Sequence, residues 1–259
     1  MVGSTLHFID SYHLLTFDEL DSTNEEAKRL AKAGGQHGAV LWAKTQTHGK
    51  GRDGRQWVSE EGNLFFSLLL QPCASVERLP QLSFVASLAL YQALAYVLND
   101  PAAVTLKWPN DVLVHGKKVA GILLETVLSR HQDASWVIIG VGVNIMHHPE
   151  DASYPATNIH AHGVEIISAK IVLARFLDAF DALYDEWLDK GFAYIRDQWC
   201  SVAAHMGKEI VLEEAENNVT QATMCAIGDD GALIVETEGG GTRSVYAADV
   251  RVVMPSVRE

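Results

Sequence analysis

The loop at residues 49–57, with the sequence GKGRDGRQW, restricts the possible folds more than any other stretch of the chain. Its glycines Gly49, Gly51 and Gly54 have the spacing G-x-G-x-x-G, which in dinucleotide-binding folds leads directly into a helix. Here an apolar, strand-like run at residues 64–70 follows too closely for a helix to fit between them. We therefore exclude that fold, and the sequence contains no G-x-x-x-x-G-K-[ST] motif that would indicate a P-loop.

The same loop has the composition of an anion-binding site. Each glycine can adopt positive φ, so that successive N–H groups converge on an oxyanion, while Lys50, Arg52 and Arg55 supply positive charge. Four of the 20 basic residues lie between positions 44 and 55, although the net charge is −13. We expect a local site for phosphate or carboxylate groups, and a solvated basic loop is the alternative.

Charge and cysteine content exclude several classes of protein. An excess of 33 acidic over 20 basic residues disfavours a general nucleic-acid or anionic-membrane binder. Acidic residues precede the first basic residue, Lys28, which is the reverse of an export signal. Cys73, Cys200 and Cys225 are odd in number and lack C-x-x-C spacing, as is typical of reduced thiols in a cytoplasmic protein.

The order of apolar segments predicts an α+β fold. We expect strands at 39–44, 64–70, 104–108, 119–126 and 136–144, and helices at 79–99, 168–189 and 192–204. Several strands interrupted by few helices favour a mixed sheet with helices on one side. The uncharged run at 79–99 could span a membrane by length, but Gln81, Gln92 and Asn99 lie nearly on one helical line. We predict a buried helix and no membrane contact.

The residues that follow Met206 have a different pattern. Short β-type runs separated by glycine-rich turns occur at 209–212, 221–227, 232–236, 243–246 and 250–253. We therefore divide the chain into a main domain, residues 1–206, and a small C-terminal β-barrel, residues 207–259.

Near the N-terminus, the sequence DSTNEE predicts the start of a helix. Ser22 with Glu25, or Thr23 with Glu26, has the spacing of a capping box. These polar residues would then only cap the helix, or they would line a binding site. The pattern alone leaves both interpretations open.

Two further patterns can carry chemistry. Residues 107–111, KWPND, end a strand, and Lys118 returns on a hairpin whose turn lies near residues 115–116. An Asn-Asp pair there can bind a metal or accept a proton, and Lys118 can bring a cation to it. Gly140 and Gly142 share one face of an apolar strand, which clears space for a flat ligand or for a closely packed helix.

Together these motifs resemble the biotin protein ligases, also called biotin–acetyl-CoA-carboxylase ligases. DSTN at 21–24 is similar to the family's opening motif, and residues 46–57 to its Q-x-x-G-R-G-R-x-G-R-x-W loop. KWPND at 107–111, K-x-x-G-I-L-x-E at 118–125 and G-x-G-x-N at 140–144 follow in the family's order. The resemblance implies a catalytic core like that of the class II aminoacyl-tRNA synthetases.

The resemblance also implies a two-step reaction. The carboxylate of biotin attacks the α-phosphorus of ATP to give biotinyl-5′-adenylate and pyrophosphate, and a lysine of a biotin carboxyl carrier domain then attacks the mixed anhydride. Because two anions meet in the first step, we expect Arg52, Lys118 and Mg²⁺ to offset their charge. Asp111 is the candidate base for the second step. The ligands of the metal stay unassigned.

Individual residues acquire roles by the same resemblance. Ser22, Thr23 and Gln46 would bind the ureido and thiophane end of biotin. Trp57 would cover the site, and Asn144 would lie near the adenine. The other residues expected to contact biotin or nucleotide are Asn24, Gly49, Lys50, Gly51, Arg52, Arg55, Lys107, Asn110, Lys118, Gly121, Gly140 and Gly142. Of these, Gly51, Gly121, Gly140 and Gly142 would leave room for biotin and adenylate.

One departure and two alternatives remain open. The family usually has arginine where this chain has Lys50, and lysine lacks the bidentate fork, which leaves the role of Lys50 undecided. A lipoate protein ligase shares the fold and the adenylate chemistry, and a non-catalytic protein that binds biotin or nucleotide is the second alternative. Some family members carry an N-terminal DNA-binding domain, but DSTN begins at Asp21 here, so we expect no nucleic-acid partner. The resemblance is compatible with a homodimer.

Overall fold

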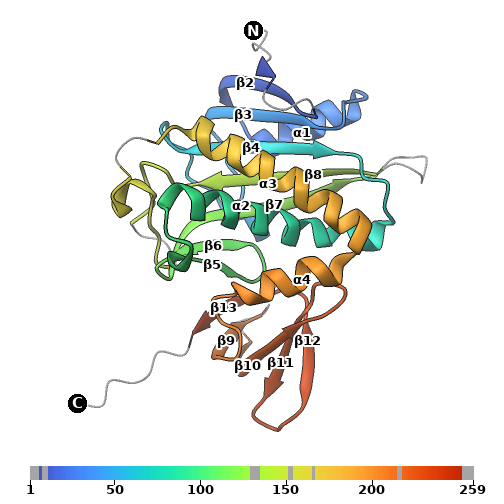
Figure 1. Cartoon of the computed structure of the whole chain (residues 1–259), viewed down its shortest axis with the longest axis vertical. Helices are drawn as coiled ribbons and strands as arrows, with labels where there is room; N and C mark the ends of the chain where they lie inside the picture. The colour runs from blue at the N-terminus through green and yellow to red at the C-terminus, as the bar shows by residue number, and fades with distance from the viewer. Residues whose placement is uncertain are drawn as a thin grey trace.

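The structure, a computed structural model, describes residues 6–7, 11–128, 135–150, 154–164, 167–214 and 218–252. Figure 1 shows a large sheet crossed by two long helices, and a smaller sheet at the C-terminal end of the chain. The large sheet has eight strands in the order β1-β2-β3-β4-β8-β7-β6-β5. The smaller sheet has five strands in the order β12-β11-β10-β9-β13.

The large sheet is mixed, as the sequence predicts. Its strands are β1 (Leu6–His7), β2 (His13–Leu20), β3 (Ala39–Gln46), β4 (Leu64–Leu70), β5 (Val104–Lys107), β6 (Asp111–Val114), β7 (Lys117–Val127) and β8 (Trp136–Val143). Strands β2 and β3 are parallel and are joined by helix α1 (Thr23–Lys32), whereas the other described strand pairs of this sheet are antiparallel. The five predicted strands are present.

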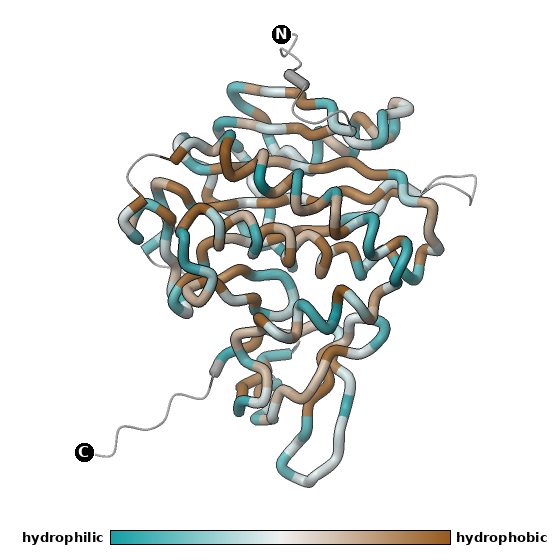
Figure 2. Tube along the Cα trace, viewed as in Figure 1, coloured by the Kyte–Doolittle hydropathy of each residue, from teal (hydrophilic) through white to brown (hydrophobic). Residues whose placement is uncertain are grey.

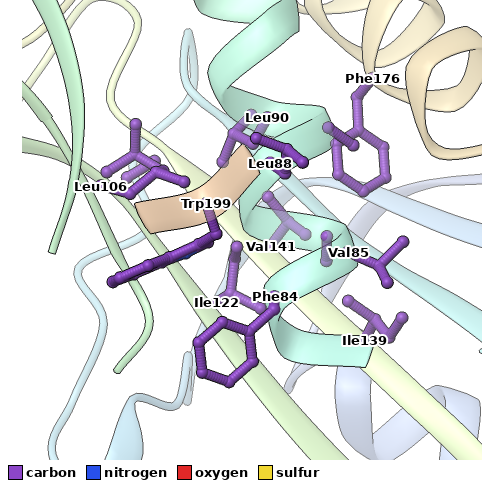
Figure 3. Close-up of a cluster of buried hydrophobic side chains, with 14 of the residues drawn as sticks. Phe84, Val85, Leu88, Leu90, Leu106, Ile122, Ile139, Val141, Phe176 and Trp199 are labelled. Atoms are coloured by element: carbon purple, nitrogen blue, oxygen red, sulfur yellow. The ribbon is translucent and has the colours of Figure 1, made fainter. Parts of the chain in front are cut away.

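Two long helices cover one face of this sheet. They are α2 (Leu82–Leu98), which follows the 3₁₀ turn η2 (Val76–Gln81), and α3 (Ala169–Lys190). Figure 2 shows apolar segments concentrated in the large sheet and in these helices, and Figure 3 shows Val141 and Ile122 of the sheet near Val85 and Leu88 of α2. The segment Val76–Leu98 is long and apolar enough to span a membrane, but 67% of its most apolar window is buried inside the protein. The apolar residues of this segment thus pack in the hydrophobic core.

Helix α1 packs against the opposite face. Its Ala27 and Ala31 form a small apolar cluster with Leu41, Leu69 and Ile138 of the sheet. The residues next to these on β4 and β8 point to the other face, because side chains alternate along a strand. The expectation of helices on one side therefore holds for α2 and α3 but not for α1. The connection between two parallel strands must pass over one face of the sheet, and α1 covers the face opposite α2 and α3. The rest of this face is left for a binding site.

The hairpin formed by β6 and β7 has its turn at His115 and Gly116, as predicted. Both turn residues have positive φ, 48° and 75°, which is the geometry of the tight turns preferred in hairpins. The turn returns Lys118 toward Asp111, and this pairing shapes the site described below.

The smaller sheet follows helix α4 (Phe192–Ser201). Its strands are β9 (Glu209–Glu213), β10 (Val219–Ile227), β11 (Leu233–Thr237), β12 (Thr242–Val245) and β13 (Asp249–Val252), all antiparallel. All five predicted runs are strands, and residue 253 lies outside the described residues. Within the described part of the chain, β12 and β13 are edge strands that do not pair with each other, so the sheet is open. The division at residue 206 stays a prediction.

The turn between β10 and β11 joins the smaller sheet to the main body. Trp108 Nε1 donates to Gly231 O at 3.1 Å, and Gln81 Nε2 donates to Asp229 O at 3.2 Å. The remaining short helices are the 3₁₀ turns η1 (Arg52–Gly54), η3 (Pro101–Ala103) and η4 (His160–His162). The hydrogen bonds from Trp108 and Gln81 thus hold the smaller sheet against the main body.

Candidate active site

A cavity of about 320 Å³ opens on the face of the large sheet that α2 and α3 leave free. Its walls come from the start of α1, the glycine-rich loop, the KWPND turn, β7, β8 and β13. Every residue predicted for the site lines this cavity except Gly49, which packs against the backbone carbonyl of Trp57. The separate motifs of the sequence thus form one site.

The polar residues at the start of α1 belong to the cavity wall. Ser22, Thr23 and Asn24 are buried, and the N-cap Ser22 makes no side-chain hydrogen bond to the helix backbone. Instead, the backbone N of Thr23 donates to Gln46 Oε1 at 2.8 Å, and Thr23 Oγ1 lies 3.2 Å from the same oxygen. The predicted capping box is therefore wrong, and the binding-site interpretation fits these contacts.

Sequence analysis missed Ser67, the buried hydroxyl beneath these residues. Its Oγ donates to Asn24 Oδ1 at 2.6 Å and lies 2.8 Å from Thr23 Oγ1. A signal was present, since Ser67 is the only polar residue in the fully buried strand LFFSLLL. A hydroxyl in such a strand requires a partner, which here is the polar start of α1.

The strand glycines make room for neighbouring side chains. A Cβ on Gly140 would lie 2.1 Å from Asn24 Oδ1, and one on Gly142 would lie 2.5 Å from Trp57 Cε2. A Cβ on Gly121 would lie 3.0 Å from Trp57 Cζ3. Close packing of a helix thus explains Gly140, while Gly121 and Gly142 let the indole of Trp57 lie on the sheet. Room for a flat ligand at these glycines stays a prediction.

The glycine-rich loop is a narrow hairpin that turns at η1. Trp57 N donates to Gly49 O at 2.9 Å, and Gly51 N donates to Arg55 O at 2.7 Å. Of the three glycines only Gly54 has positive φ, so the expectation is wrong for the other two. Gly49 is needed for space, because a Cβ there would lie 2.4 Å from Trp57 O. The loop's charge therefore resides in its side chains rather than in converging N–H groups.

The three cations of the loop have different partners. Lys50 Nζ lies 2.6 Å from Glu25 Oε1 on α1. Arg55 forms a two-pronged ion pair with Asp249 on β13, at 2.6 and 3.2 Å.

Arg52 differs from both of them. Its contact is with the side-chain amide of Asn110, at 3.4 Å. Among the described residues, Arg52 has no carboxylate within ion-pairing distance. Its charge is therefore the one least matched within the loop.

Asp111 joins the two lysines of the KWPND segment and the hairpin. Lys107 Nζ lies 3.1 Å from Asp111 Oδ2, and Lys118 Nζ lies 2.6 Å from Oδ1. The second contact is an ion pair, so the charge of Oδ1 is matched by Lys118 although Oδ1 accepts no hydrogen bond from the described residues. Both ammonium groups also lie over aromatic rings, Lys107 over Tyr154 and Lys118 over Trp57, at 4.4 and 5.4 Å.

The two lysines determine the protonation of Asp111. Burial alone would raise the pKa of this carboxyl, but Lys118 and Lys107 outweigh burial and hold the pKa below its usual value. Asp111 is therefore a carboxylate at neutral pH. Its negative charge in turn fixes the position of Lys118 at the edge of the cavity.

Comparisons with known proteins agree with this geometry. The model of the Biotin/lipoate A/B protein ligase family matches residues 16–144, and that of the Biotin protein ligase C terminal domain matches residues 205–253. The biotin--[acetyl-CoA-carboxylase] ligase of Paracoccus denitrificans is 37% identical over 239 residues, which are 89% of this chain and 96% of that protein. The chain belongs to the biotin protein ligase family. The resemblance found in the sequence is confirmed, and the chain is an ATP-dependent ligase by class.

Other relatives extend this likeness. The bifunctional ligase/repressor BirA of Bacillus subtilis is 33% identical over 249 residues, covering 93% of this chain and 74% of that protein. A biotin protein ligase from Aquifex aeolicus, solved in complex with biotin and ATP, superposes with a TM-score of 0.77 at 30% identity. The superposition covers 93% of this chain and 99% of the Aquifex aeolicus chain. The α+β fold expected from the sequence is that of the biotin protein ligases.

The smaller sheet of this ligase also contributes to the site, which sequence analysis did not predict. Asp249, Val250 and Arg251 of β13 line the cavity opposite α1. Burial would raise the pKa of Asp249, but Arg55 outweighs burial and lowers it, so this carboxylate stays charged beside the loop. No local motif marks these residues, because their place depends on how the two sheets pack.

The described residues of the ligase do not form a protein cage for a metal ion. No group of three His, Cys, Asp or Glu side chains among them could hold one. Both oxygens of Asp111, the buried carboxylate of the site, already face lysine ammonium groups.

Proposed function

We propose that this ligase joins biotin to ATP as biotinyl-5′-adenylate and transfers biotin to a lysine of a biotin carboxyl carrier domain. The observation that carries the proposal is the convergence of Arg52 and Lys118 on a cavity whose other end is polar and buried. A carboxylate and a triphosphate can meet only where positive charge is placed between them. The buried end offers hydroxyl and amide groups that suit an uncharged ureido ring.

In the first half-reaction, Lys118 and Arg52 would offset the charge of the two reacting anions. The side chain of Lys118 is 27% exposed at the cavity, and Asp111 holds its ammonium group in place. Arg52 has a guanidinium without a carboxylate partner in the described structure, and it can turn from Asn110 to a phosphate. Lys118, already held by Asp111, is the preorganised charge that can stabilise a developing oxyanion without moving during the reaction.

Asp111 suits a positioning role in this scheme better than that of the base expected from the sequence. A general base is most effective when its pKa lies near the working pH. The pKa of Asp111 is lowered by its two lysines, which makes it a weak proton acceptor. We therefore propose that Asp111 mainly orients Lys118. The alternative role, acceptance of a proton from the attacking lysine, is distinguished by comparing the two half-reactions in Asp111→Asn.

Magnesium enters this proposal only as a companion of ATP. The chain offers no cluster of carboxylates for it in the described residues, and we derive no step from a metal held by the protein. Mg²⁺ commonly binds proteins through one or two carboxylates together with substrate phosphates.

Release of pyrophosphate tests the proposed function. Purified protein is mixed with ATP and Mg²⁺, and pyrophosphate is measured after addition of biotin, lipoate or neither. Release with biotin alone supports the proposal. Release with lipoate alone would identify a lipoate ligase, and biotin binding without release would identify a non-catalytic binding protein.

The acceptor and the compartment belong to the same proposal. We propose a biotin carboxyl carrier protein or domain as the acceptor and the cytoplasm as the compartment, where the three free cysteines of the described structure would stay reduced. Labelling of a carrier domain with biotin, compared with a variant that lacks its acceptor lysine, tests the partner. A homodimer stays a prediction that sedimentation of the purified protein can test.

A further inference from the structure

Lys50 connects the glycine-rich loop to a charged network on α1 and β7. Its Nζ lies 2.6 Å from Glu25 Oε1, and the same oxygen lies 2.9 Å from Lys28 Nζ. Lys28 reaches on to Glu125 Oε1 at 2.7 Å. Glu125 also accepts from Asn24 Nδ2 at 2.9 Å, so the network ends at the buried floor of the cavity.

This arrangement explains why lysine suits position 50. The contact with Glu25 uses one donor and one oxygen, for which a compact ammonium group is sufficient. The hydrogen bond from Lys50 is the main cause that lowers the pKa of Glu25, so this carboxylate is ionised at neutral pH. Lys50 therefore has its charge matched on the helix, in contrast to Arg52.

The ion pair lies where it can control access to the cavity. The chain enters the loop from Gln46 at the end of β3, which bonds Thr23, and the loop ends at Trp57, which lies on Gly121 and Gly142. Lys50 is near the start of this loop, and Glu25 is on the first turn of α1, beside the buried polar residues. Breaking the pair would remove the contact between Lys50 and α1 and leave in place the bond between Gln46 and Thr23 and the groups that line the floor.

We propose that Lys50 and Glu25 form a clasp that holds the glycine-rich loop against α1 over bound biotin and so sets the rate at which biotin dissociates. Lys50 is then a positioning residue and not a ligand of the ATP phosphates. This inference rests on the proposed function, because it takes biotin as the ligand. It assigns Lys50 a role distinct from that of Arg52 in the same loop.

The size of the effect follows from the exposure of the pair. The side chains of Lys50 and Glu25 are 46% and 27% exposed, and ion pairs of this kind change an equilibrium by up to about fivefold. Salt screens such pairs strongly, since the Debye length falls to about 3 Å at 1 M. We therefore expect loss of the ion pair to raise the rate of biotin dissociation by about two- to fivefold at low salt, and to leave it unchanged at high salt.

The main experiment measures the dissociation rate of labelled biotin in a chase with unlabelled biotin. Glu25→Gln and Lys50→Gln should each raise this rate by about two- to fivefold, and the double variant should raise it no further. In 1 M NaCl the parent should approach the rate of the variants. Glu26→Gln is the matched control, because Glu26 is the neighbouring carboxylate of α1 and pairs with Arg29 rather than with the loop.

Two further measurements distinguish the clasp from other roles. Hydrogen exchange in the ligand-free protein should show a faster amide at Gly51 in Glu25→Gln than in Glu26→Gln. At saturating biotin, Glu25→Gln should keep the parental KM for ATP, whereas Arg52→Gln should raise it.

Several results would overturn the clasp. One is that biotin dissociation and exchange of the Gly51 amide are unchanged in Glu25→Gln. Another is that the effects of Glu25→Gln and Lys50→Gln add in the double variant. A third is that the main effect of Lys50→Gln is a rise in the KM for ATP. If the parent failed to bind biotin at all, the proposed function would fall, while hydrogen exchange would still decide whether the ion pair holds the loop.

Discussion

The face of the large sheet beneath α2 and α3 and the face that carries the cavity are built from the same strands. On the covered face, β4 and β8 contribute residues such as Phe66 and Val141 to an apolar core. On the open face, the adjacent residues of those strands are Ser67, Gly140 and Gly142. Because side chains alternate along a strand, the two sets are fixed to the same backbone.

This difference shows how the protein separates stability from activity. The covered face excludes water and provides most of the apolar burial, whereas the open face buries polar groups that must find partners within the site. Changes to the first face should act on the free energy of unfolding. Changes to the second should act on the reaction, and the following predictions test that division.

The largest expected effect is on stability, from Phe176→Ala on the covered face. Phe176 is fully buried, and its ring packs against Phe66 and Phe180 with centroid distances of 5.0 and 5.6 Å. The substitution should lower the free energy of unfolding by about 3–5 kcal/mol in urea denaturation. Ile171→Ala, at an exposed position of the same helix, is the control and should change it by less than about 0.5 kcal/mol. A folded Phe176→Ala protein with lost activity and parental stability would break the division.

Lys118→Ala should have the largest effect on the reaction. The cation beside Asp111 is lost, so we expect the rate of biotinyl-adenylate formation to fall on the order of 10²–10³-fold. Asp111 keeps Lys107 as a partner, so the fold should persist. Lys117→Ala, one residue earlier and exposed, should retain the parental rate. Adenylate formation at the parental rate by folded Lys118→Ala would remove Lys118 from the mechanism.

The boundary between the two sheets should show a pH-dependent stability. His205 is buried there, and burial, together with Lys107 and Lys208, lowers its pKa from 6.5 to about 4. The unfolded chain therefore binds the proton more readily than the folded chain, and stability falls as the pH drops from 6.5 to about 4. We expect a loss of about 2–3 kcal/mol from this group.

Urea denaturation at pH 7 and pH 4.5 measures this effect. In His205→Gln the loss of stability over that interval should be smaller than in the parent, since the substituted side chain does not titrate. The same loss in both proteins would assign the acid sensitivity to other groups.

Asp111→Asn should have the smallest of these effects, and it decides how the open face works. If Asp111 orients Lys118, adenylate formation and transfer to the acceptor should each slow by about tenfold. If Asp111 instead accepts the proton of the attacking amine, only transfer should slow, and the deficit should shrink at high pH. Single-turnover measurements of the two half-reactions distinguish these outcomes.

The sequence predicted those parts of the site that are positioned by residues close to them in the chain. The turn at His115 and Gly116 brings Lys118 back to Asp111 within seven residues, so the spacing alone indicated that they meet. The apolar runs likewise predicted the strands of both sheets, because length and side-chain pattern decide those elements.

The rest depends on contacts between distant segments. Asp249 meets Arg55 across 194 positions, and nothing in the residues around either one indicates the other. At the start of α1, the sequence likewise did not indicate that Thr23 bonds Gln46 of β3, or that Ser22 makes no side-chain hydrogen bond to the helix. Gly140 has no neighbour in the sequence that indicates its role, because the side chain that fills the space above it belongs to Asn24 on α1.

The position of β13 in the cavity wall has a consequence for the synthesis of the protein. Residues 22 and 249 line the same cavity, so the site is incomplete until almost the whole described chain has left the ribosome. Earlier segments can fold and pair as they emerge, since domains form as units during translation. A nascent chain without β13 would lack the carboxylate of Asp249 that pairs with Arg55 in the glycine-rich loop. Completion of the cavity wall is thus coupled to the folding of the smaller sheet, which supplies β13.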